Sequence, residues 1–296
     1  MRHGISILPD LPWREAGPRW RAVEEMGFSH AWVYDHLVWG GLPDSAWFPA
    51  VPTLAAAAGV TSTIRLGTFV TSPNFRHPYL FARDVLALDD LSDGRFLCGL
   101  GTGGDLDSTI LGESHPLRAR VDRFHEFVPL LDRLLREDHV DHDGEWYAVR
   151  DARTLPAPVR DRVPFVVAAN GPRSLRLAAS HGDAWVTTGT GGETMEEWWT
   201  GVATLAQRFT DTSGSEGKDR YLLLDGSPRF SLESVGLYEE MTGRAAGLGF
   251  TDTITHWPRP SDPYAGSEAT LEEVASRVLR GGTDAGATSG TVSGAK

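Results

Sequence analysis

Short apolar runs alternate with amphipathic stretches along almost the whole chain. The apolar runs are rich in β-branched and aromatic residues and end in polar or glycine-containing turns, a pattern that is typical of buried parallel strands. Strands are predicted at residues 4–8, 31–34, 64–71, 96–100, 165–169, 184–187, 221–224 and 252–256. Between them, apolar residues at helical spacing predict helices at 13–26, 48–59, 78–91, 118–135, 172–182, from 194, 234–248 and from 270.

Local signals fix several helix ends. Gly27 is expected to stop the first helix and Pro78 to start the third. Thr194 and Thr270 are each followed three residues later by Glu, and this spacing predicts a capping box at the start of the sixth and eighth helices. Pro129 lies inside the fourth helix, where it is expected to kink the helix or remove one hydrogen bond.

The alternation predicts a fold class. Eight strands and eight helices in turn indicate a (β/α)8 barrel, formed as a single domain by residues 1–280. A doubly wound open sheet is the alternative. The barrel is favoured because polar residues cluster directly after the strands, and a barrel brings those loops together at one end. Residues 138–163 are expected to be an irregular insertion after the fourth helix, and the Gly/Ser/Thr-rich residues 281–296 a disordered tail.

Composition narrows the partners. The formal net charge is −12 with no basic stripe, so we expect no nucleic-acid partner. No apolar run approaches the ~18 residues of a membrane helix, and the first residues do not resemble a signal peptide, so we expect a cytoplasmic protein without membrane contact. The lone Cys98 excludes an internal disulfide and is expected to be a small core residue.

Two loops that follow strands carry candidate chemistry. Asp35 and His36 follow the second strand and offer a hydrogen-bond acceptor beside a group that titrates near neutral pH. The alternative is a pair that only ties its loop to a neighbouring loop. The glycine loop at residues 101–104 lacks the spacing of a dinucleotide or P-loop motif, but it allows close approach of the backbone to a flat ligand. Asp105 and Asp107 lie just beyond this loop.

The turn after the fifth strand predicts an anion site. Asn170 and Gly171 end the strand, and Pro172 opens a helix whose first amides carry a partial positive charge. A phosphate is expected to bind the amides of Gly171, Arg173 and Ser174, with the Arg173 guanidinium as a second clamp. An ordinary strand-to-helix turn is the alternative.

Other polar residues have simpler explanations. Arg76 and His77 are expected either to pair with an anionic group or to cap the helix that starts at Pro78. His and Asp residues are also concentrated in a polar turn at residues 139–143, but no regular element fixes their geometry there, so we predict a surface segment and no metal site.

Three segments together resemble the luciferase-like monooxygenase superfamily. The first is Trp32-x-x-Asp35-His36, the second runs from Ile64 to Pro78, and the third is the Gly94–Gly103 segment that ends in Gly-Thr-Gly. Asn-Gly-Pro at 170–172 and Gly-Asp-Ala-Trp at 182–185 extend the resemblance. Within this superfamily, Asp-His after the second strand resembles the branch that uses coenzyme F420, a 5-deazaflavin.

The resemblance implies roles for particular residues. Asp35 would contact the deazaflavin ring, His36 would donate or accept a proton, and a non-prolyl cis peptide would lie at Phe69–Val70 behind the ring. Some members carry a catalytic Glu after Gly-Thr-Gly, whereas this chain has Gly104 and then Asp105, so Asp105 is a second catalytic candidate. The expected cofactor-binding residues are Asp35, Phe69, Val70, Thr71, Gly101, Thr102, Gly103, Asp107, Asn170, Gly171, Pro172, Arg173 and Ser174.

The resemblance also implies an activity. A deazaflavin reacts poorly with oxygen, so an F420-dependent reductase or dehydrogenase acting on a small molecule or peptide is expected, with the protein supplying orientation and proton transfer. With reduced FMN in the same pocket, the protein would instead be a monooxygenase. A protein that only sequesters a flavin or serves in an assembly is a third alternative. Barrels of this type often form homodimers, so a homodimer is expected here.

Overall fold

Eight parallel strands close into a barrel in the computed structural model, which describes residues 1–280. Around the barrel the strands follow the order β1, β10, β9, β8, β7, β4, β3, β2, and the β1–β10 pairing from Arg2↔Asp252 to Ser6↔His256 closes the ring. The (β/α)8 prediction is therefore confirmed. The barrel strands are β1 Arg2–Ser6, β2 His30–Val33, β3 Arg65–Thr68, β4 Phe96–Leu100, β7 Phe165–Ala168, β8 Ala184–Thr187, β9 Asp219–Leu223 and β10 Asp252–His256.

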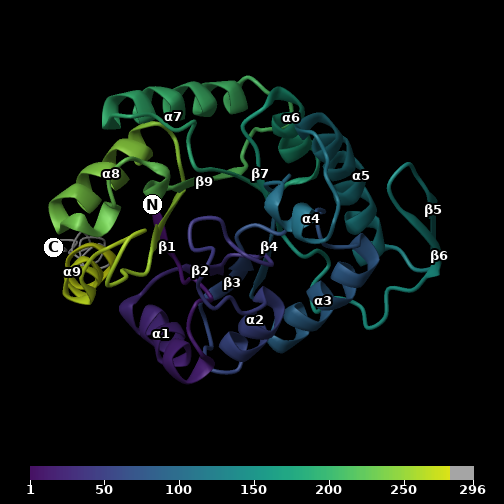
Figure 1. Ribbon diagram of the computed structural model, residues 1–296, viewed down its shortest axis with the longest axis horizontal. Helices are drawn as coiled ribbons and strands as arrows, with labels where there is room; N and C mark the ends of the chain where they lie inside the picture. The colour runs from purple at the N-terminus through teal and green to yellow at the C-terminus, as the bar shows by residue number, and fades with distance from the viewer. Residues whose placement is uncertain (281–296) are drawn as a thin grey trace, which may run out of the picture.

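Helices surround the barrel (Figure 1). Their apolar faces pack on the outside of the strands, while a second cluster that includes Trp32, Phe69 and Tyr221 fills the interior. The larger apolar core therefore lies between the ring of helices and the barrel strands, as the amphipathic spacing predicts. The helices are α1 Trp13–Met26, α2 Ala50–Ala58, α3 Pro78–Leu91, α4 Leu106–Ile110, α5 Leu117–Arg136, α6 Pro172–His181, α7 Met195–Thr210, α8 Val235–Gly247 and α9 Glu268–Val274, with short 3-10 turns at Leu224–Gly226 and Ser231–Glu233 and a π-helical turn at Ala275–Arg280.

The predicted helix ends are confirmed in part. Thr194 and Glu197 form the expected capping box of α7. The predicted start at Thr270 is wrong, because α9 begins at Glu268 and its cap is the Ser267 hydroxyl, which accepts a hydrogen bond from the amide of Ala269. A serine three residues before Thr270 supplies the cap first, so Thr270 lies inside the helix.

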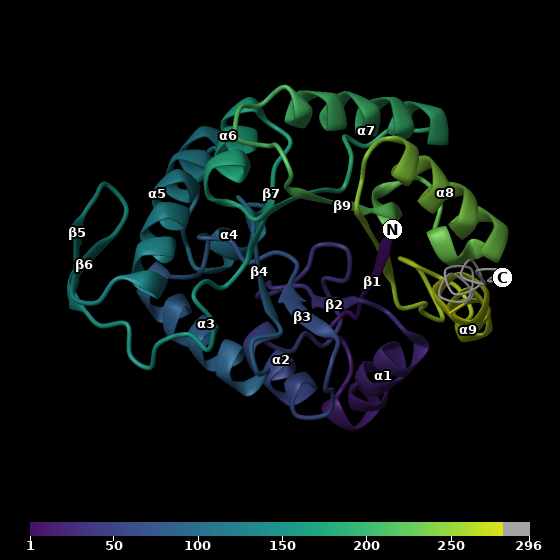
Figure 2. The same cartoon turned by 180° about the vertical axis from the view of Figure 1, so that it is seen from behind.

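The insertion after α5 is not irregular as predicted. It contains an antiparallel hairpin of β5 Val140–Asp143 and β6 Ala148–Ala152, which projects beyond α3 and α5 in both ribbon views (Figures 1 and 2). Glu126 of α5 anchors it by accepting hydrogen bonds from the amides of Trp146 and Tyr147 and by pairing with His142 at 3.0 Å. Hydrogen bonds between residues so far apart in sequence are not indicated by any local pattern, so the polar residues of this segment did not predict a hairpin.

Two findings concern absences within residues 1–280. No group of three or more His, Cys, Asp and Glu side chains there is placed to hold a metal ion. None of the helices in this range is long and apolar enough to cross a membrane. The predicted disordered tail at 281–296 lies outside the described residues.

A buried polar network holds the amino-terminal end of the barrel, opposite the loops that carry the candidate chemistry. Arg2 donates to both oxygens of Asp252 at 2.8 and 2.6 Å, and His30 Nε2 lies 3.1 Å from the same carboxylate. Burial alone would raise the pKa of Asp252, but the hydrogen bonds from His30 and Arg2 outweigh it and lower the pKa to about 2. This network closes the β1–β10 seam and is a structural feature.

His3 in β1 makes stability depend on pH. Burial, which disfavours the imidazolium form, lowers the pKa of His3 to about 4. The unfolded chain therefore binds more protons between the ordinary value of 6.5 and 4, and stability falls as the pH is lowered through this window. We expect His3 to contribute a loss of at most about 2 kcal/mol in the free energy of unfolding from pH 7 to pH 5.

Urea unfolding of the wild type and of His3→Gln at the two pH values measures this contribution. The wild type should lose more stability than the variant, while His139→Gln, which replaces an exposed histidine, should behave like the wild type. An equal pH slope in the wild type and His3→Gln would contradict the prediction.

Candidate active site

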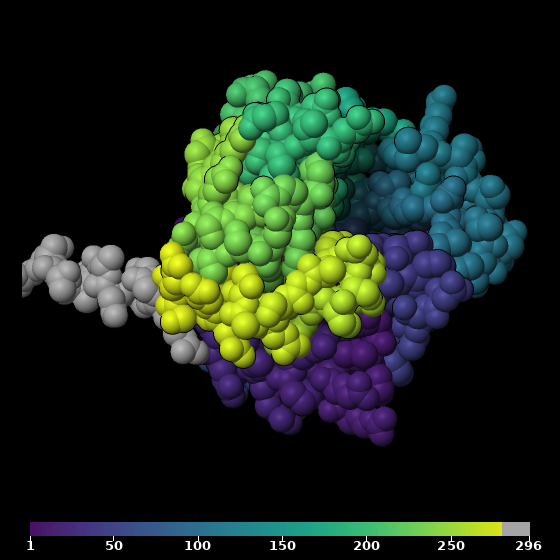
Figure 3. All heavy atoms as spheres, turned by 60° about the vertical axis from the view of Figure 1, so that its left-hand side comes forward, coloured from purple at the N-terminus to yellow at the C-terminus, as the bar shows by residue number. Residues whose placement is uncertain are grey.

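A cavity of about 610 Å3 lies at the carboxyl ends of the barrel strands. Figure 3 shows the surface hollowed between the green part of the chain and the teal-blue part. The loops after β2, β3, β4, β7 and β8 all contribute, as a barrel requires. The lining residues are Tyr34, His36, Phe69, Val70, Thr102, Gly103, Gly104, Leu117, Val121, Ala168, Ala169, Asn170, Gly171, Ser174, Val186, Thr187 and Thr188.

His36 is oriented by a buried carboxylate. Its Nδ1 lies 2.8 Å from Oδ2 of Asp107, and the side chain of Asp107 is only 1% exposed. The second oxygen of Asp107 accepts a hydrogen bond from the amide of Leu37 at 2.7 Å, so the carboxylate is fixed on both sides. An Nδ1–H that points to a carboxylate leaves Nε2 as the basic nitrogen of the ring. His36 thus presents an imidazole on the cavity wall, and Asp107 positions it.

Asp35 does not line the cavity, and its hydrogen bonds hold neighbouring loops together. Arg76 donates to both of its oxygens at 2.8 and 2.7 Å, and the hydroxyl of Thr71 donates at 2.7 Å. Burial alone would lower the pKa of Arg76, but the bonds to Asp35 reverse this and raise it. Arg76 thus pairs with an anionic group, and His77 caps α3 by accepting from the amide of Tyr79, so both alternatives for this segment are realised.

A second buried network reaches the same wall. The Tyr34 hydroxyl lies 2.9 Å from His256 Nε2, and His256 Nδ1 lies 2.9 Å from Asp225 Oδ2. The side chains of His256 and Asp225 are at most 1% exposed. Burial raises the pKa of Tyr34 well above its ordinary value, so its phenol stays neutral and donates the hydrogen bond to His256. Tyr34 also stacks on Phe69, with 6.0 Å between ring centroids.

The backbone behind the cavity approaches closely at two glycines. The Phe69–Val70 peptide bond is cis, as the resemblance implied. A Cβ on Gly101 would lie 2.5 Å from Val70 Cγ2, so only glycine fits against that segment. Gly103 has φ +70°, and a Cβ there would lie 2.6 Å from Asn74 and Ser72. Asn74 in turn donates to the carbonyl oxygens of Thr102 and Gly104, which holds the glycine loop against the cavity.

The far end of the cavity is the amino terminus of α6. No side chain caps this helix at Gly171, so its first amides remain available to an anion. Asn170 is fixed beside it by bonds from Thr187 at 2.7 Å and to the Gly189 carbonyl at 2.9 Å. Arg173, the predicted guanidinium clamp, pairs with Asp122 at 2.7 Å across the mouth of the groove, and its side chain is 45% exposed.

A surface groove of about 690 Å3 continues from this end of the cavity. It shares Leu117, Val121, Gly171 and Ser174 with the cavity and extends to Arg118, Asp122, Pro172 and Arg173. Cavity and groove therefore form one path from His36, past the start of α6, to two arginines.

The structure brings together part of the predicted site. His36, Phe69, Val70, Thr102, Gly103, Asn170, Gly171 and Ser174 line the cavity, and Pro172 and Arg173 line the groove. Residues that do not line the cavity are Asp35, Thr71, Gly101, Asp105 and Asp107. Asp105 is exposed, and its carbonyl oxygen accepts from the hydroxyls of Ser108 and Thr109 in the turn that starts α4.

Sequence reasoning missed two groups of cavity residues. The apolar pattern predicts Tyr34 as the end of a buried strand, and its position directly before Asp35 is the only local signal that it lines the cavity. Thr187 ends β8 and Thr188 follows it, so the rule that strand ends carry chemistry would have found both.

Comparisons with known proteins agree with this geometry. Residues 1–217 match the luciferase-like monooxygenase family. The chain is 31% identical over 271 residues to an F420-dependent glucose-6-phosphate dehydrogenase of Kineococcus radiotolerans, a match that covers 87% of this chain and 76% of the relative. It is 30% identical over 276 residues to an F420-dependent hydroxymycolic acid dehydrogenase of Mycobacterium tuberculosis, over 92% of this chain and 73% of the relative.

A solved structure has the same fold. The coenzyme F420 dependent tetrahydromethanopterin reductase from Methanopyrus kandleri superposes with a TM-score of 0.75 at 16% identity, over 95% of this chain and 99% of the other. The sequence segments, the barrel fold and the family match all indicate the same family. The chain belongs to the luciferase-like monooxygenase family.

Proposed function

We propose that this protein is a coenzyme F420-dependent oxidoreductase that transfers a hydride between the deazaflavin and a small organic substrate. The observation that carries the proposal is the single path from the His36–Asp107 pair, along the cavity, to the free amides of α6. The relatives that cover most of this chain are F420-dependent dehydrogenases by name. The deazaflavin ring would bind near His36 at one end of this path, and the coenzyme's phosphate would bind the amides of α6 at the other end.

The groove beyond α6 favours F420 over FMN. FMN ends at its phosphate, whereas F420 continues from the phosphate into a lactyl and oligoglutamate chain that carries several carboxylates. The groove starts where the phosphate would bind and leads to Arg118 and Arg173. Guanidinium groups suit carboxylates, and a tail is the part of F420 that needs such a groove.

The protein's own residues would orient the reactants and handle the proton. When bound, the deazaflavin supplies a carbon that accepts or donates hydride. His36 Nε2 would take the substrate's hydroxyl proton during oxidation and return it during reduction, while Asp107 keeps Nδ1 protonated and the ring oriented. Asp35 acts at a distance, by holding Arg76 and Thr71 behind this wall.

Titration with three ligands tests the proposal. We expect F420 to bind at least tenfold more tightly than FMN, and more tightly than the deazaflavin nucleoside that lacks both phosphate and tail. Replacement of Arg118 by Ala should weaken F420 binding by about three- to tenfold, as expected for loss of an exposed charged contact, and should leave the nucleoside unaffected. Coenzyme fluorescence measures each binding constant.

Arg150→Ala is the matched control for Arg118→Ala. It removes the same type of side chain from the β5–β6 hairpin, and Arg150 does not line the groove. It should bind F420 like the wild type. Tight FMN binding without F420 binding would contradict the proposal and would support the alternative, a monooxygenase that uses reduced FMN.

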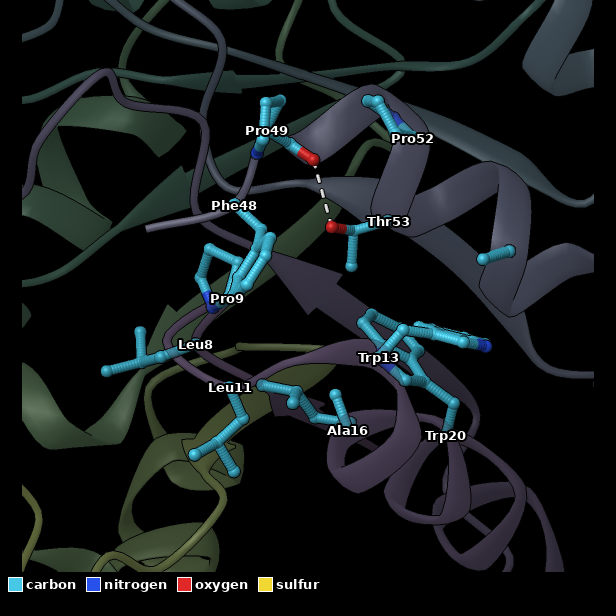
Figure 4. A pocket seen from close by; sticks show the side chains of 12 residues that line it. Leu8, Pro9, Leu11, Trp13, Ala16, Trp20, Phe48, Pro49, Pro52 and Thr53 are labelled. Atoms are coloured by element: carbon cyan, nitrogen blue, oxygen red, sulfur yellow. Dashed lines mark hydrogen bonds between the residues drawn. The ribbon is translucent and has the colours of Figure 1, made fainter. Parts of the chain in front are cut away.

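We further propose that the protein is a cytoplasmic homodimer. The free Cys98 thiol is buried, which suits a reducing compartment. A small apolar pocket between α1 and α2 opens at the surface beside Trp13 and Phe48, which are 38% and 40% exposed (Figure 4). Leu80 and Leu91 of the neighbouring α3 are also exposed, so this side of the barrel offers an apolar face to a second copy. Light scattering measures the molar mass.

A further inference from the structure

A second cavity, of about 460 Å3, lies at the same end of the barrel, beside β9 and β10. Three aromatic side chains from three different loops line it: Trp39, Phe230 and Tyr264. We call it the aromatic cavity. Its wall toward the first cavity is thin, because Tyr34 lines the first cavity and contacts Trp39 with 5.3 Å between ring centroids.

The aromatic wall is held rigidly. Tyr264 stacks on His256 at 3.6 Å between centroids and lies parallel to Trp39 at 6.1 Å. Its φ of +68° is in the left-handed region, a strained conformation for a tyrosine that persists only where the surroundings impose it. Phe230 packs beside Tyr264 at 5.9 Å, and a Cβ on Gly266 would lie 2.7 Å from its ring.

The arginines around the aromatic cavity are already paired with carboxylates. Arg229, which lines it, donates to both oxygens of Glu233 at 2.9 and 2.7 Å. Arg259, in the loop that carries Tyr264, pairs with Asp10 at 3.2 Å and donates to the carbonyl oxygens of residues 262 and 263, so it serves as the scaffold of that loop.

The carboxylates add negative charge. Asp225 and Asp262 both line the aromatic cavity, and Asp225 accepts hydrogen bonds from the Ser231 amide, the His256 amide and the His256 ring. Of the residues that line this cavity, Arg229 alone is cationic, and its partner is Glu233. A phosphate or carboxylate substrate would therefore meet acidic groups with no free counter-charge.

We propose that the aromatic cavity binds the ring of an uncharged aryl alcohol or aryl ketone, and that this protein does not use a sugar phosphate. The inference rests on the proposed function and names its substrate class. In oxidation, the carbinol C–H passes as hydride to the deazaflavin, the O–H proton passes to His36, and the C=O bond forms. Reduction reverses each transfer, with F420 as the balancing redox partner.

Binding and turnover of named probes test the inference. By calorimetry, acetophenone should bind the F420-loaded protein at least tenfold more tightly than glucose 6-phosphate. With F420, 1-phenylethanol should be oxidised with a kcat/KM at least 100-fold that of glucose 6-phosphate. Trp39→Ala should raise the KM for 1-phenylethanol at least tenfold with kcat within threefold, because it removes ring contacts and leaves His36 in place.

Trp146→Ala, in the hairpin on the opposite side of the barrel, is the matched control and should leave KM unchanged. Efficient turnover of glucose 6-phosphate, or failure of both aryl probes with F420 bound, would overturn the substrate assignment alone. Absence of F420 binding would instead overturn the proposed function, and this inference with it.

Discussion

Replacement of His36 by Asn is expected to lower kcat by about 10²- to 10⁴-fold, the range for loss of a general acid–base group. Binding of F420 should stay within about threefold of the wild type, because the amides of α6 and the groove that holds the tail are unchanged. The physical reason is that His36 is the imidazole on the cavity wall, with Asp107 fixing its Nδ1 at 2.8 Å. Steady-state kinetics and coenzyme fluorescence measure the two effects separately.

Two further variants make this result specific. Asp107→Asn should lower kcat by a smaller factor, since it removes the carboxylate that orients the imidazole. His139→Asn, on the hairpin, should behave as the wild type. An unchanged kcat in His36→Asn would contradict the catalytic role and would favour a protein that only sequesters its flavin.

Replacement of Asp35 by Ala is expected to have the largest effect on stability. It would leave the Arg76 guanidinium, whose side chain is 17% exposed, without the partner that accepts two of its hydrogen bonds. Breaking a buried pair from one side costs about 3–5 kcal/mol. For a chain of this size the loss corresponds to a Tm lower by about 5–8 °C, which calorimetry measures.

Asp84→Asn is the matched control. Asp84 reaches the same arginine at 3.5 Å from a position 39% exposed, so its loss should cost less than about 1 kcal/mol. A melting temperature of Asp35→Ala within about 2 °C of the wild type would contradict a structural role for this carboxylate.

The sequence was most informative where a signal is local. Strand runs, the Pro78 start and the Thr194 capping box depend on residues within one or two turns, and the structure has each of them. The eightfold alternation sufficed for the barrel because a βα repeat has few ways to bury its apolar faces. The barrel then placed His36 and the glycine loop at one end, 66 residues apart in sequence between His36 and Thr102.

Pairings between distant side chains could not be predicted. The sequence predicts Asp107 as a cofactor-binding residue beside the glycine loop. It gives no sign that the Asp107 carboxylate contacts His36, which lies 71 positions earlier in the sequence. No local signal indicates that Arg173 pairs with Asp122 of α5. The Tyr34–His256–Asp225 network joins the ends of β2, β9 and β10, and no short motif encodes it. Such contacts depend on which loops the closed barrel brings side by side.

A crystal structure of the protein with F420 is the most direct test of the central claim, that one path from His36 to α6 holds this coenzyme. The account predicts the phosphate on the amides of Arg173 and Ser174, the tail in the groove beside Arg118, and the ring against Phe69–Val70 with its reactive edge within about 4 Å of His36. A phosphate bound away from α6, or a ring bound in the aromatic cavity, would contradict the account.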